Sequence, residues 1–231
     1  MPFHRLKLLV KHLLGRDLLI QRKVHISLEH YGNRYGDWSV PANYVTPESI
    51  IYSFGIGEDA SWDLGLIQAK NCQVHGYDPT PKSLSWVENN IRDSRFTLHP
   101  WALADADGTL DLWLPSNKDF VSASCRASDS SSSEKITVPC RSLGSIMNEL
   151  GHEFVDVLKM DIEGAEYSVI EQILREGLEQ RIGVILIEFH HWMSAFELED
   201  TRKAVAGLAE AGFLPAWVSE TGHEILFVRS E

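Results

Sequence analysis

Residues 49–62 are the feature that most constrains this chain, because they combine a buried strand, a glycine turn and the start of a helix. The apolar run 50–54 is short and rich in β-branched and aromatic residues, which predicts a strand. Gly55 and Gly57 then allow the backbone to turn tightly and to approach a ligand closely. Residues 60–70 show helical spacing, so the free N–H groups of a helix start would face this turn. A nucleotide-like cofactor fits such a crevice at the carboxyl end of a strand.

A second predicted strand, residues 73–78, ends in the carboxylate of Asp78. Asp78 follows Gly57 by about 20 positions, the distance at which an acidic residue binds the ribose hydroxyls in dinucleotide-binding folds. Each motif also has a purely structural interpretation. The glycine spacing occurs in ordinary strand-to-helix turns, and an aspartate before Pro79 is common in turns. For the two motifs taken alone, both interpretations stay open.

Length and composition bound the kinds of protein that this chain can be. A chain of 231 residues predicts one domain, or one domain with an extension. No apolar run approaches the roughly 18–20 residues that span a bilayer, and the N-terminus lacks the pattern of a signal peptide. The net charge of −12 argues against a general nucleic-acid binder. Three cysteines without a C-x-x-C pair fit reduced thiols in a cytoplasm.

The N-terminal part differs from the rest of the chain in charge. Residues 1–25 contain six basic residues and one acidic residue. The apolar spacing over 3–20 predicts an amphipathic helix that packs on the main domain or on a second subunit, as in a homodimer. A peripheral membrane contact through residues 1–25 stays open, because basic amphipathic helices favour anionic lipid. Residues 24–47 look too polar and aromatic for a core strand, and they either fold over the cofactor crevice or form a surface loop.

Strands and helices alternate along the remaining chain, which predicts an α/β fold with a parallel sheet and helices on both faces. Further strands are expected at residues 96–99, 109–114, 135–140, 154–160 and 182–189. Residues 213–218 and 223–229 predict a closing antiparallel pair. Thr80 and Ser142 are predicted helix N-caps. Residues 122–134 are a polar low-complexity segment, for which we expect a disordered surface loop or a mobile lid.

Four motifs, taken together, are more specific than the glycine turn. They are FGIG at 54–57, YDP at 77–79, WAL at 101–103 and LKMDIEGAE at 158–166. In this order they resemble the FkbM-like family of S-adenosylmethionine (SAM)-dependent methyltransferases over about residues 48–190. The resemblance implies a Rossmann-like class I methyltransferase fold, with a seven-stranded, mostly parallel sheet and a C-terminal antiparallel strand. Residues 48–231 would form the methyltransferase domain, and residues 1–47 a helical extension or cap.

The resemblance also implies a cofactor, a reaction and a set of contacts. The cofactor is SAM, and the reaction is O-methylation of a small-molecule or sugar-like hydroxyl. The residues implied to contact SAM are Phe54, Gly55, Gly57, Asp78, Trp101, Ala102, Leu103 and Asp161. The glycines would line the methionine part, Asp78 would hold the ribose, and residues 101–103 would border the adenine. Asp161 would lie beside the methyl group.

One departure from the family's pattern concerns the amino group of SAM. The family usually carries an acidic residue in its first strand, where this chain has Tyr52 and Ser53. Glu58 or Asp59 would bind the amino group instead.

Methyl transfer to a hydroxyl also needs a group that removes the proton. Candidates at the ends of two neighbouring core strands are Asp161, Glu163, Glu188, His190 and His191. We favour Asp161 or His190 as the base and keep Glu163 as a third catalytic candidate; histidine needs little change of its pKa to act near neutral pH. Structural interpretations stay open, namely a hydrogen-bonded histidine pair and a helix-capping Glu163. A divalent metal on Asp161, Glu188 and His190 is chemically feasible, but we expect a site without metal.

Two other functions stay open on the sequence. An NAD-dependent oxidoreductase would use the same glycine turn and Asp78. The DIEG segment at 161–164, the closing hairpin and the lack of a second substrate domain argue against it. A non-catalytic SAM-binding or interaction protein would use the basic N-terminal helix as its working surface. We favour a cytoplasmic methyltransferase that acts on a small-molecule acceptor.

Overall fold

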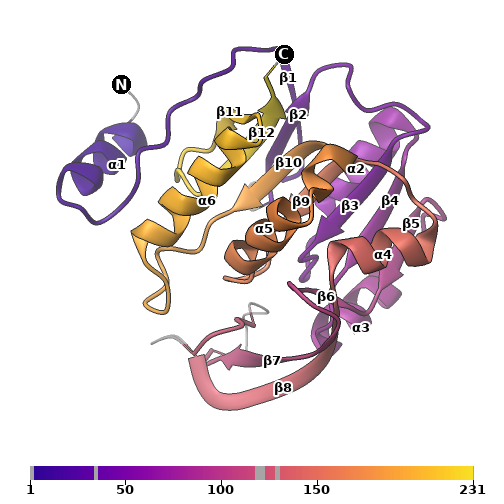
Figure 1. The fold of residues 1–231 in the computed structure, drawn as a ribbon. Coiled ribbons are helices and arrows are strands. Elements are labelled where there is room, and N and C mark those ends of the chain that lie inside the picture. Colours follow the sequence, from indigo (N-terminus) through magenta and orange to yellow (C-terminus); the bar gives the residue numbers. More distant parts are fainter. Residues whose placement is uncertain (1–2, 34–35, 118–122, 128–130, 231) are drawn as a thin grey trace.

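A seven-stranded sheet forms the centre of the computed structural model, which describes residues 3–33, 36–117, 123–127 and 131–230 (Figure 1). In order across the sheet, the strands are β5 (Phe96–His99), β4 (Gln73–Tyr77), β3 (Ile50–Phe54), β9 (Val155–Met160), β10 (Ile182–Glu188), β12 (Glu224–Arg229) and β11 (Phe213–Val218). Neighbours from β5 to β10 are parallel, whereas β12 runs antiparallel to both β10 and β11. The predicted fold class, with its antiparallel strand near the C-terminus, is confirmed.

Helices cover both faces of this sheet, because alternate residues of a strand point to opposite faces. The helices that pack on it are α2 (Ser61–Lys70), α3 (Pro81–Asn90), α4 (Leu143–Leu150), α5 (Glu166–Arg175) and α6 (Leu198–Glu210), and a 3-10 turn, η1 (Leu178–Arg181), precedes β10. In β3, Tyr52 and Phe54 pack in the apolar cluster that contains residues of α4, α5 and α6. Ile51 packs in the opposite cluster with residues of α2. Two apolar cores therefore hold the sheet between them.

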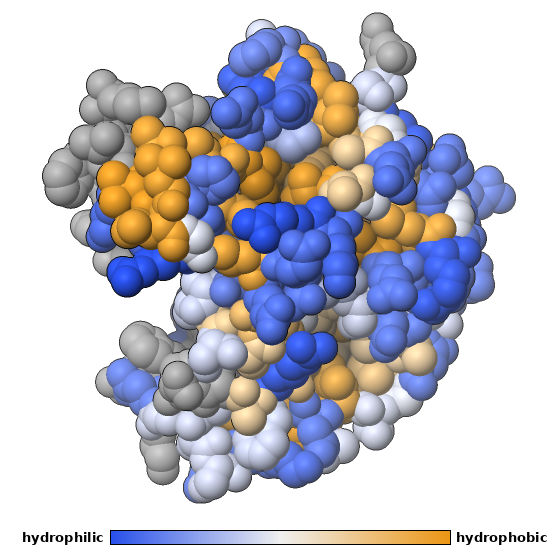
Figure 2. Space-filling view, turned by 60° about the vertical axis from the view of Figure 1, so that its left-hand side comes forward, coloured by the Kyte–Doolittle hydropathy of each residue, from blue (hydrophilic) through white to orange (hydrophobic). Residues whose placement is uncertain are grey.

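A smaller sheet lies below the main one in Figure 1. It consists of β6 (Ala102–Leu103), β8 (Ser131–Arg141) and β7 (Gly108–Pro115), with β7 and β8 antiparallel. Figure 2 shows a recess in the surface above this smaller sheet. The predicted N-cap Ser142 is confirmed, because its hydroxyl accepts the Ser145 N–H at 3.3 Å, at the start of α4.

The prediction of a disordered loop over residues 122–134 is wrong where the structure describes this segment. Residues 131–134 belong to β8, where Ser131 pairs with Pro115 of β7. Ser124 is buried and exchanges two backbone hydrogen bonds with Trp113, at 2.8 and 3.0 Å. Backbone pairing orders the segment although its side chains are polar, because a strand ladder does not depend on apolar content. Residues 122 and 128–130 lie outside the described residues.

The predicted N-terminal helix over 3–20 is shorter than expected. It forms α1 (Phe3–Leu13) and ends where Gly15 adopts a φ of +66°. The N–H of Arg16 then donates to the carbonyl of Lys11 at 2.9 Å, which is the wide hydrogen bond of a glycine C-cap. None of the helices in the described part of the chain is long and apolar enough to cross a membrane.

Residues 24–47 contain a hairpin that the sequence did not predict. Its strands are β1 (Leu28–Tyr31) and β2 (Trp38–Pro41), paired antiparallel. Trp38 and Val40 are buried in the apolar cluster beneath α2. The expectation that this segment is too polar for a core strand is wrong, because alternate residues of β2 supply an apolar face while the polar ones point away.

His75 and His99 form a buried pair between β4 and β5. Nδ1 of His75 lies 3.0 Å from Nε2 of His99, so one ring donates a hydrogen bond to the other. Burial, together with the charges of neighbouring histidines, lowers the pKa of each ring to about 4. Both rings are therefore neutral at pH 7.

These pKa values predict that mild acid destabilises the fold. In the unfolded chain the histidines titrate near 6.5, so between about pH 6.5 and 4 the unfolded state binds more protons and the free energy of unfolding falls as the pH falls. The effect is on the order of 3 kcal/mol per histidine at the acid end. In urea unfolding at a series of pH values across this window, His75→Gln should flatten the pH dependence. The exposed His25→Gln serves as a control with no expected change; an equally steep dependence in both variants would contradict the assignment.

Candidate active site

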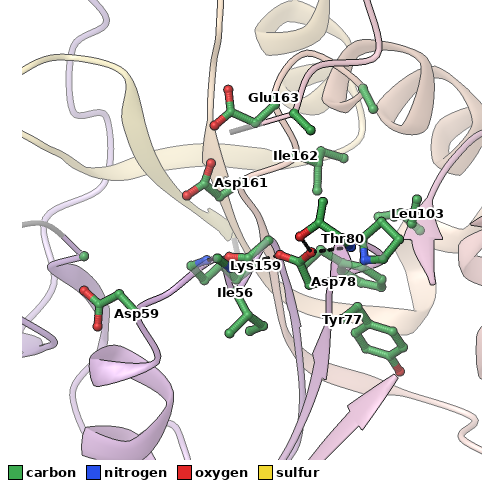
Figure 3. Close-up of a pocket in the computed structure, with 18 of the residues that line it drawn as sticks. Ile56, Asp59, Tyr77, Asp78, Thr80, Leu103, Lys159, Asp161, Ile162 and Glu163 are labelled. Atoms are coloured by element: carbon green, nitrogen blue, oxygen red, sulfur yellow. Dashed lines mark hydrogen bonds between the residues drawn. The ribbon is translucent and has the colours of Figure 1, made fainter. Parts of the chain in front are cut away.

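A pocket of about 240 Å³ opens at the carboxyl ends of β3, β4 and β9 (Figure 3). All residues predicted to contact the cofactor line it: Phe54, Gly55, Gly57, Glu58, Asp59, Asp78, Trp101, Ala102, Leu103 and Asp161. Of the other predicted catalytic residues, Glu163 lines the pocket, whereas His190 lies behind its wall. The strands end at the edge where parallel α/β sheets bind their ligands.

The turn after β3 brings two strand ends into contact. Gly55 has a φ of +82°, and a Cβ atom on it would lie 1.8 Å from the carbonyl oxygen of Asp161. The N–H of Asp161 donates to the carbonyl of Phe54 at 3.1 Å, and the N–H of Gly55 donates to that of Tyr77 at 3.0 Å. Only glycine combines this φ with this approach. The turn therefore fixes Asp161 beside the glycines.

Asp78 organises the middle of the pocket. Its Oδ2 accepts the N–H of Gly57 at 2.9 Å, across the turn. Its Oδ1 accepts the N–H of Thr80 at 2.9 Å and the Thr80 hydroxyl at 2.6 Å. Thr80 does occupy the predicted N-cap position of α3, but its hydroxyl serves Asp78 instead of the helix. Asp78 is thus held rigidly at the end of β4.

The adenine side predicted at residues 101–103 is apolar. Leu103 is fully buried, and Trp101 carries the guanidinium of Arg141 on its ring at 4.6 Å. Leu110 and Leu112 of β7 close the same end of the pocket. Sequence reasoning predicted β7 as a half-buried strand but did not place it at the pocket, since its position depends on how the smaller sheet docks.

The opposite end of the pocket carries carboxylates. Asp59 accepts the N–H of Ser61 at 2.8 Å through Oδ1 and the side-chain amide of Asn33 at 2.6 Å through Oδ2. Glu58 forms an ion pair with Lys82 at 3.1 Å. Gly36 and Trp38 also line the pocket, so the segment before β3 does fold over the crevice, which was one of the two sequence interpretations.

Two charged residues of the pocket were missed by sequence reasoning. Lys159 is buried, donates to the carbonyl of Gly55 at 3.3 Å and lies 5.3 Å from the ring centre of Trp38. Asp63 is buried beneath it, and burial raises the pKa of Asp63, while the charge of Lys159 opposes the rise. A lysine inside the apolar run of β9 was the available signal, because an unpaired ammonium is costly to bury.

Four carboxylates surround the buried ring of His190. Nε2 of His190 lies 3.7 Å from Asp161, 3.5 Å from Glu163 and 3.9 Å from Glu188. Nδ1 lies 3.2 Å from Oε1 of Glu166, and this same oxygen accepts a hydrogen bond from the backbone N–H of His190 at 2.9 Å. The ends of β9 and β10 therefore bring four of the five predicted candidates together, namely Asp161, Glu163, Glu188 and His190. Glu166, which is fully buried, was not predicted as part of the site.

The carboxylates control the charge of this ring. Burial by itself lowers the pKa of His190, but the carboxylates of Glu166, Glu163 and Glu188 outweigh it and raise the pKa well above the ordinary value. Burial and the charge of Asp161 raise the pKa of Glu188 well above its usual range. The carboxylates therefore favour the protonated form of this ring.

His191 lies apart from the pocket. Its Nε2 contacts Oδ1 of Asp17 at 3.0 Å, and its Nδ1 contacts the hydroxyl of Thr201 at 3.0 Å. Asp17 also accepts from Lys11 at 3.0 Å. His191 therefore anchors the N-terminal extension to the end of β10.

The chain is similar in sequence to a methyltransferase domain family and to two probable methyltransferase-like proteins. The model of the Methyltransferase FkbM domain matches residues 55–215. The human "Probable methyltransferase-like protein 24" is 31% identical over 156 residues, which cover 67% of this chain and 36% of that protein. Its rat counterpart is 29% identical over 162 residues, which cover 69% of this chain and 38% of that protein. The chain thus spans less than two fifths of the curated relatives that it matches.

Two solved structures are similar at a more distant level. Fibrillarin of Aeropyrum pernix, in complex with natively bound S-adenosyl-L-methionine, is 9% identical with a TM-score of 0.45, over 90% of this chain and 84% of that chain. A methyltransferase from Pyrococcus furiosus is 10% identical with a TM-score of 0.39, over 100% of both chains. The family match includes the glycine turn, Asp78 and the DIEG segment, and it covers more than half of the sequence. The chain therefore belongs to the FkbM methyltransferase domain family.

Proposed function

We propose that this chain transfers a methyl group from SAM to a hydroxyl group of a small, sugar-like molecule. One observation carries the proposal, namely the order of chemical groups along a single pocket. The apolar end beside Trp101 and Leu103 suits an adenine ring. The Asp78 carboxylate suits ribose hydroxyls, and the glycine turn beside Asp161 suits the methionine part. SAM has these three parts in the same order.

The hydrogen bonds of Asp78 leave room for a ribose. A carboxylate oxygen can accept about two hydrogen bonds. Among the described residues, Oδ2 of Asp78 accepts the N–H of Gly57 alone, whereas Oδ1 already accepts two from Thr80. Oδ2 can therefore accept a hydroxyl without losing a bond that holds the turn.

The reaction places separate demands on the cofactor and on the chain. When bound, SAM supplies an electrophilic methyl group on a positively charged sulfur. The chain must align the acceptor hydroxyl and take its proton. We assign to Asp161 the removal of the proton from the acceptor hydroxyl, because Asp161 lines the pocket and follows β9 directly. His190 is 1% exposed and faces Asp161 at 3.7 Å, so its role in this proposal is to position Asp161.

The charge of the pocket bears on the acceptor. Among the described residues that line it, the carboxylates of Glu58, Asp59, Asp78, Asp161 and Glu163 outnumber the ammonium of Lys159, and the chain carries a net charge of −12. Like charges repel more strongly where solvent is excluded, so phosphorylated or carboxylated acceptors are disfavoured. A neutral polyhydroxyl compound suits the pocket best.

Location and assembly stay predictions from the sequence. Cys72, Cys125 and Cys140 are free, which supports a reducing compartment such as the cytoplasm. A peripheral membrane contact or a dimer contact through residues 1–25 is supported by exposed apolar side chains on this part of the chain (Figure 2), which are those of Val10, Leu13 and Leu14.

Replacing the ribose-binding carboxylate should weaken cofactor binding. A hydrogen bond to a charged group contributes about 1.5–3 kcal/mol, so Asp78→Ala should raise the Kd for SAM and S-adenosylhomocysteine by roughly 10- to 150-fold. Calorimetric titration of the purified chain measures both ligands, with NADH as a comparison. Asp105→Ala, which removes an exposed carboxylate in the turn before β7, is the matched control. Binding of NADH with no binding of SAM or S-adenosylhomocysteine would contradict the proposal.

Removing the proposed base should slow turnover without loss of cofactor. General bases contribute typically 10²- to 10⁴-fold to the rate, so Asp161→Asn should lower kcat by that order while the Kd for SAM changes by less than about 10-fold. The assay follows transfer of a labelled methyl group from SAM to a panel of neutral sugars and other hydroxyl compounds. Asp105→Asn is the control for both quantities. A full rate in Asp161→Asn would exclude this residue as the base.

A further inference from the structure

Three atoms that can bind a metal ion lie around one small space. They belong to the carboxylates of Asp161 and Glu163 and to the ring of His190. These atoms all lie within 4.8 Å of one another. Figure 3 shows the carboxylates of Asp161 and Glu163 on the same side of the chain, with Ile162 pointing elsewhere. Atoms that bind one cation at about 2.1 Å are themselves roughly 3–4 Å apart. The distances of 3.7 and 3.5 Å from Nε2 of His190 to the two carboxylates match that spacing.

His190 gives independent evidence for a ligand at this point. Its side chain is 1% exposed, and its Nε2 points toward the carboxylates but makes no hydrogen bond to the residues that the structure describes. On its other side, Nδ1 faces the buried carboxylate of Glu166 at 3.2 Å. A carboxylate behind one ring nitrogen is the usual support of a metal-binding histidine, because it fixes the ring and leaves the other nitrogen free to bind.

Carboxylates crowd the ring of His190. Asp161, Glu163, Glu166 and Glu188 all lie within 3.9 Å of one of its ring nitrogens. Carboxylate oxygens and imidazole nitrogens are ligands that several divalent cations accept.

We propose that Asp161, Glu163 and His190 bind a divalent metal ion beside the cofactor pocket. The catalytic meaning of this site rests on the proposed function. Since Asp161 and Glu163 line the pocket, the ion would contact the acceptor oxygen, lower the pKa of its hydroxyl and orient it. Each carboxylate offers one oxygen to the ion, and the second oxygen of Asp161 stays available for the hydroxyl proton.

A second group of side chains, Asp17, His191 and His223, has a similar composition but a different environment. Asp17 already accepts hydrogen bonds from the ammonium of Lys11, the N–H of Leu18 and the ring of His191, at 3.0, 2.8 and 3.0 Å. A cation there would have to compete with the charge of Lys11. This group therefore serves as an internal control.

The test is direct metal binding by the full chain, without SAM. The protein is treated with EDTA, then titrated with MnCl₂ while the electron paramagnetic resonance signal of free Mn²⁺ is followed, and separately with ZnCl₂ by calorimetry. One ion per chain is expected. Glu163→Gln and Asp161→Asn should each weaken binding by at least about 10-fold, and the supporting variant Glu166→Gln by about 10- to 100-fold. His223→Gln should retain the wild-type Kd.

The outcomes separate the metal site from the proposed function. Thermal unfolding of each variant shows whether it is folded before its metal affinity is interpreted. Two carboxylate variants are tested, so that one of them still tests the site if the other does not fold. The metal site is overturned if neither ion binds, if both carboxylate variants bind normally, or if only His223→Gln loses binding. SAM is titrated separately into the metal-free chain. Metal binding without SAM binding would support the metal site and contradict the proposed methyl transfer. SAM binding without metal binding would contradict the metal site and support the proposed cofactor.

Discussion

The contact between the backbone of Gly55 and the backbone of Asp161 is the constraint on which the site depends. The carbonyl of Asp161 occupies the space that any side chain at position 55 would need. The hydrogen bond from the Asp161 N–H to the carbonyl of Phe54, at 3.1 Å, holds the same junction. Because β3 and β9 are adjacent parallel strands, this junction places the glycine turn and the carboxylate of Asp161 side by side at the pocket.

Two further elements complete the site from distant parts of the chain. The smaller sheet places Leu110 and Leu112 at the apolar end of the pocket, and the Ser124 hydroxyl donates to the carbonyl of Glu163 at 2.7 Å. That bond links the smaller sheet to the turn after β9. On the other side, Glu166 at the start of α5 fixes His190 after β10. The apolar end and the acidic end of the pocket are therefore supported by different layers of the fold.

The parts of the site that were predictable are those encoded by contiguous residues. The glycine turn, Asp78 and the DIEG segment each combine a strand end with residues that line the pocket, so local patterns and a family resemblance were enough to place them. Lys159 was missed because its importance depends on burial against Trp38. The raised pKa of His190 was also not predictable, because the carboxylates around its ring come from the ends of two strands and from α5. Likewise, residues 131–134 form a strand only because β7 supplies a partner.

The most direct test of the account is a crystal structure of the chain with S-adenosylhomocysteine. We expect the ribose hydroxyls on the free side of Asp78, the adenine beside Trp101 and Leu103, and the sulfur near Asp161 at the end of β9. This result would place the transferred methyl group at the carboxylates around His190. Ligand density at another site, or an adenine at the acidic end of the pocket, would contradict the account.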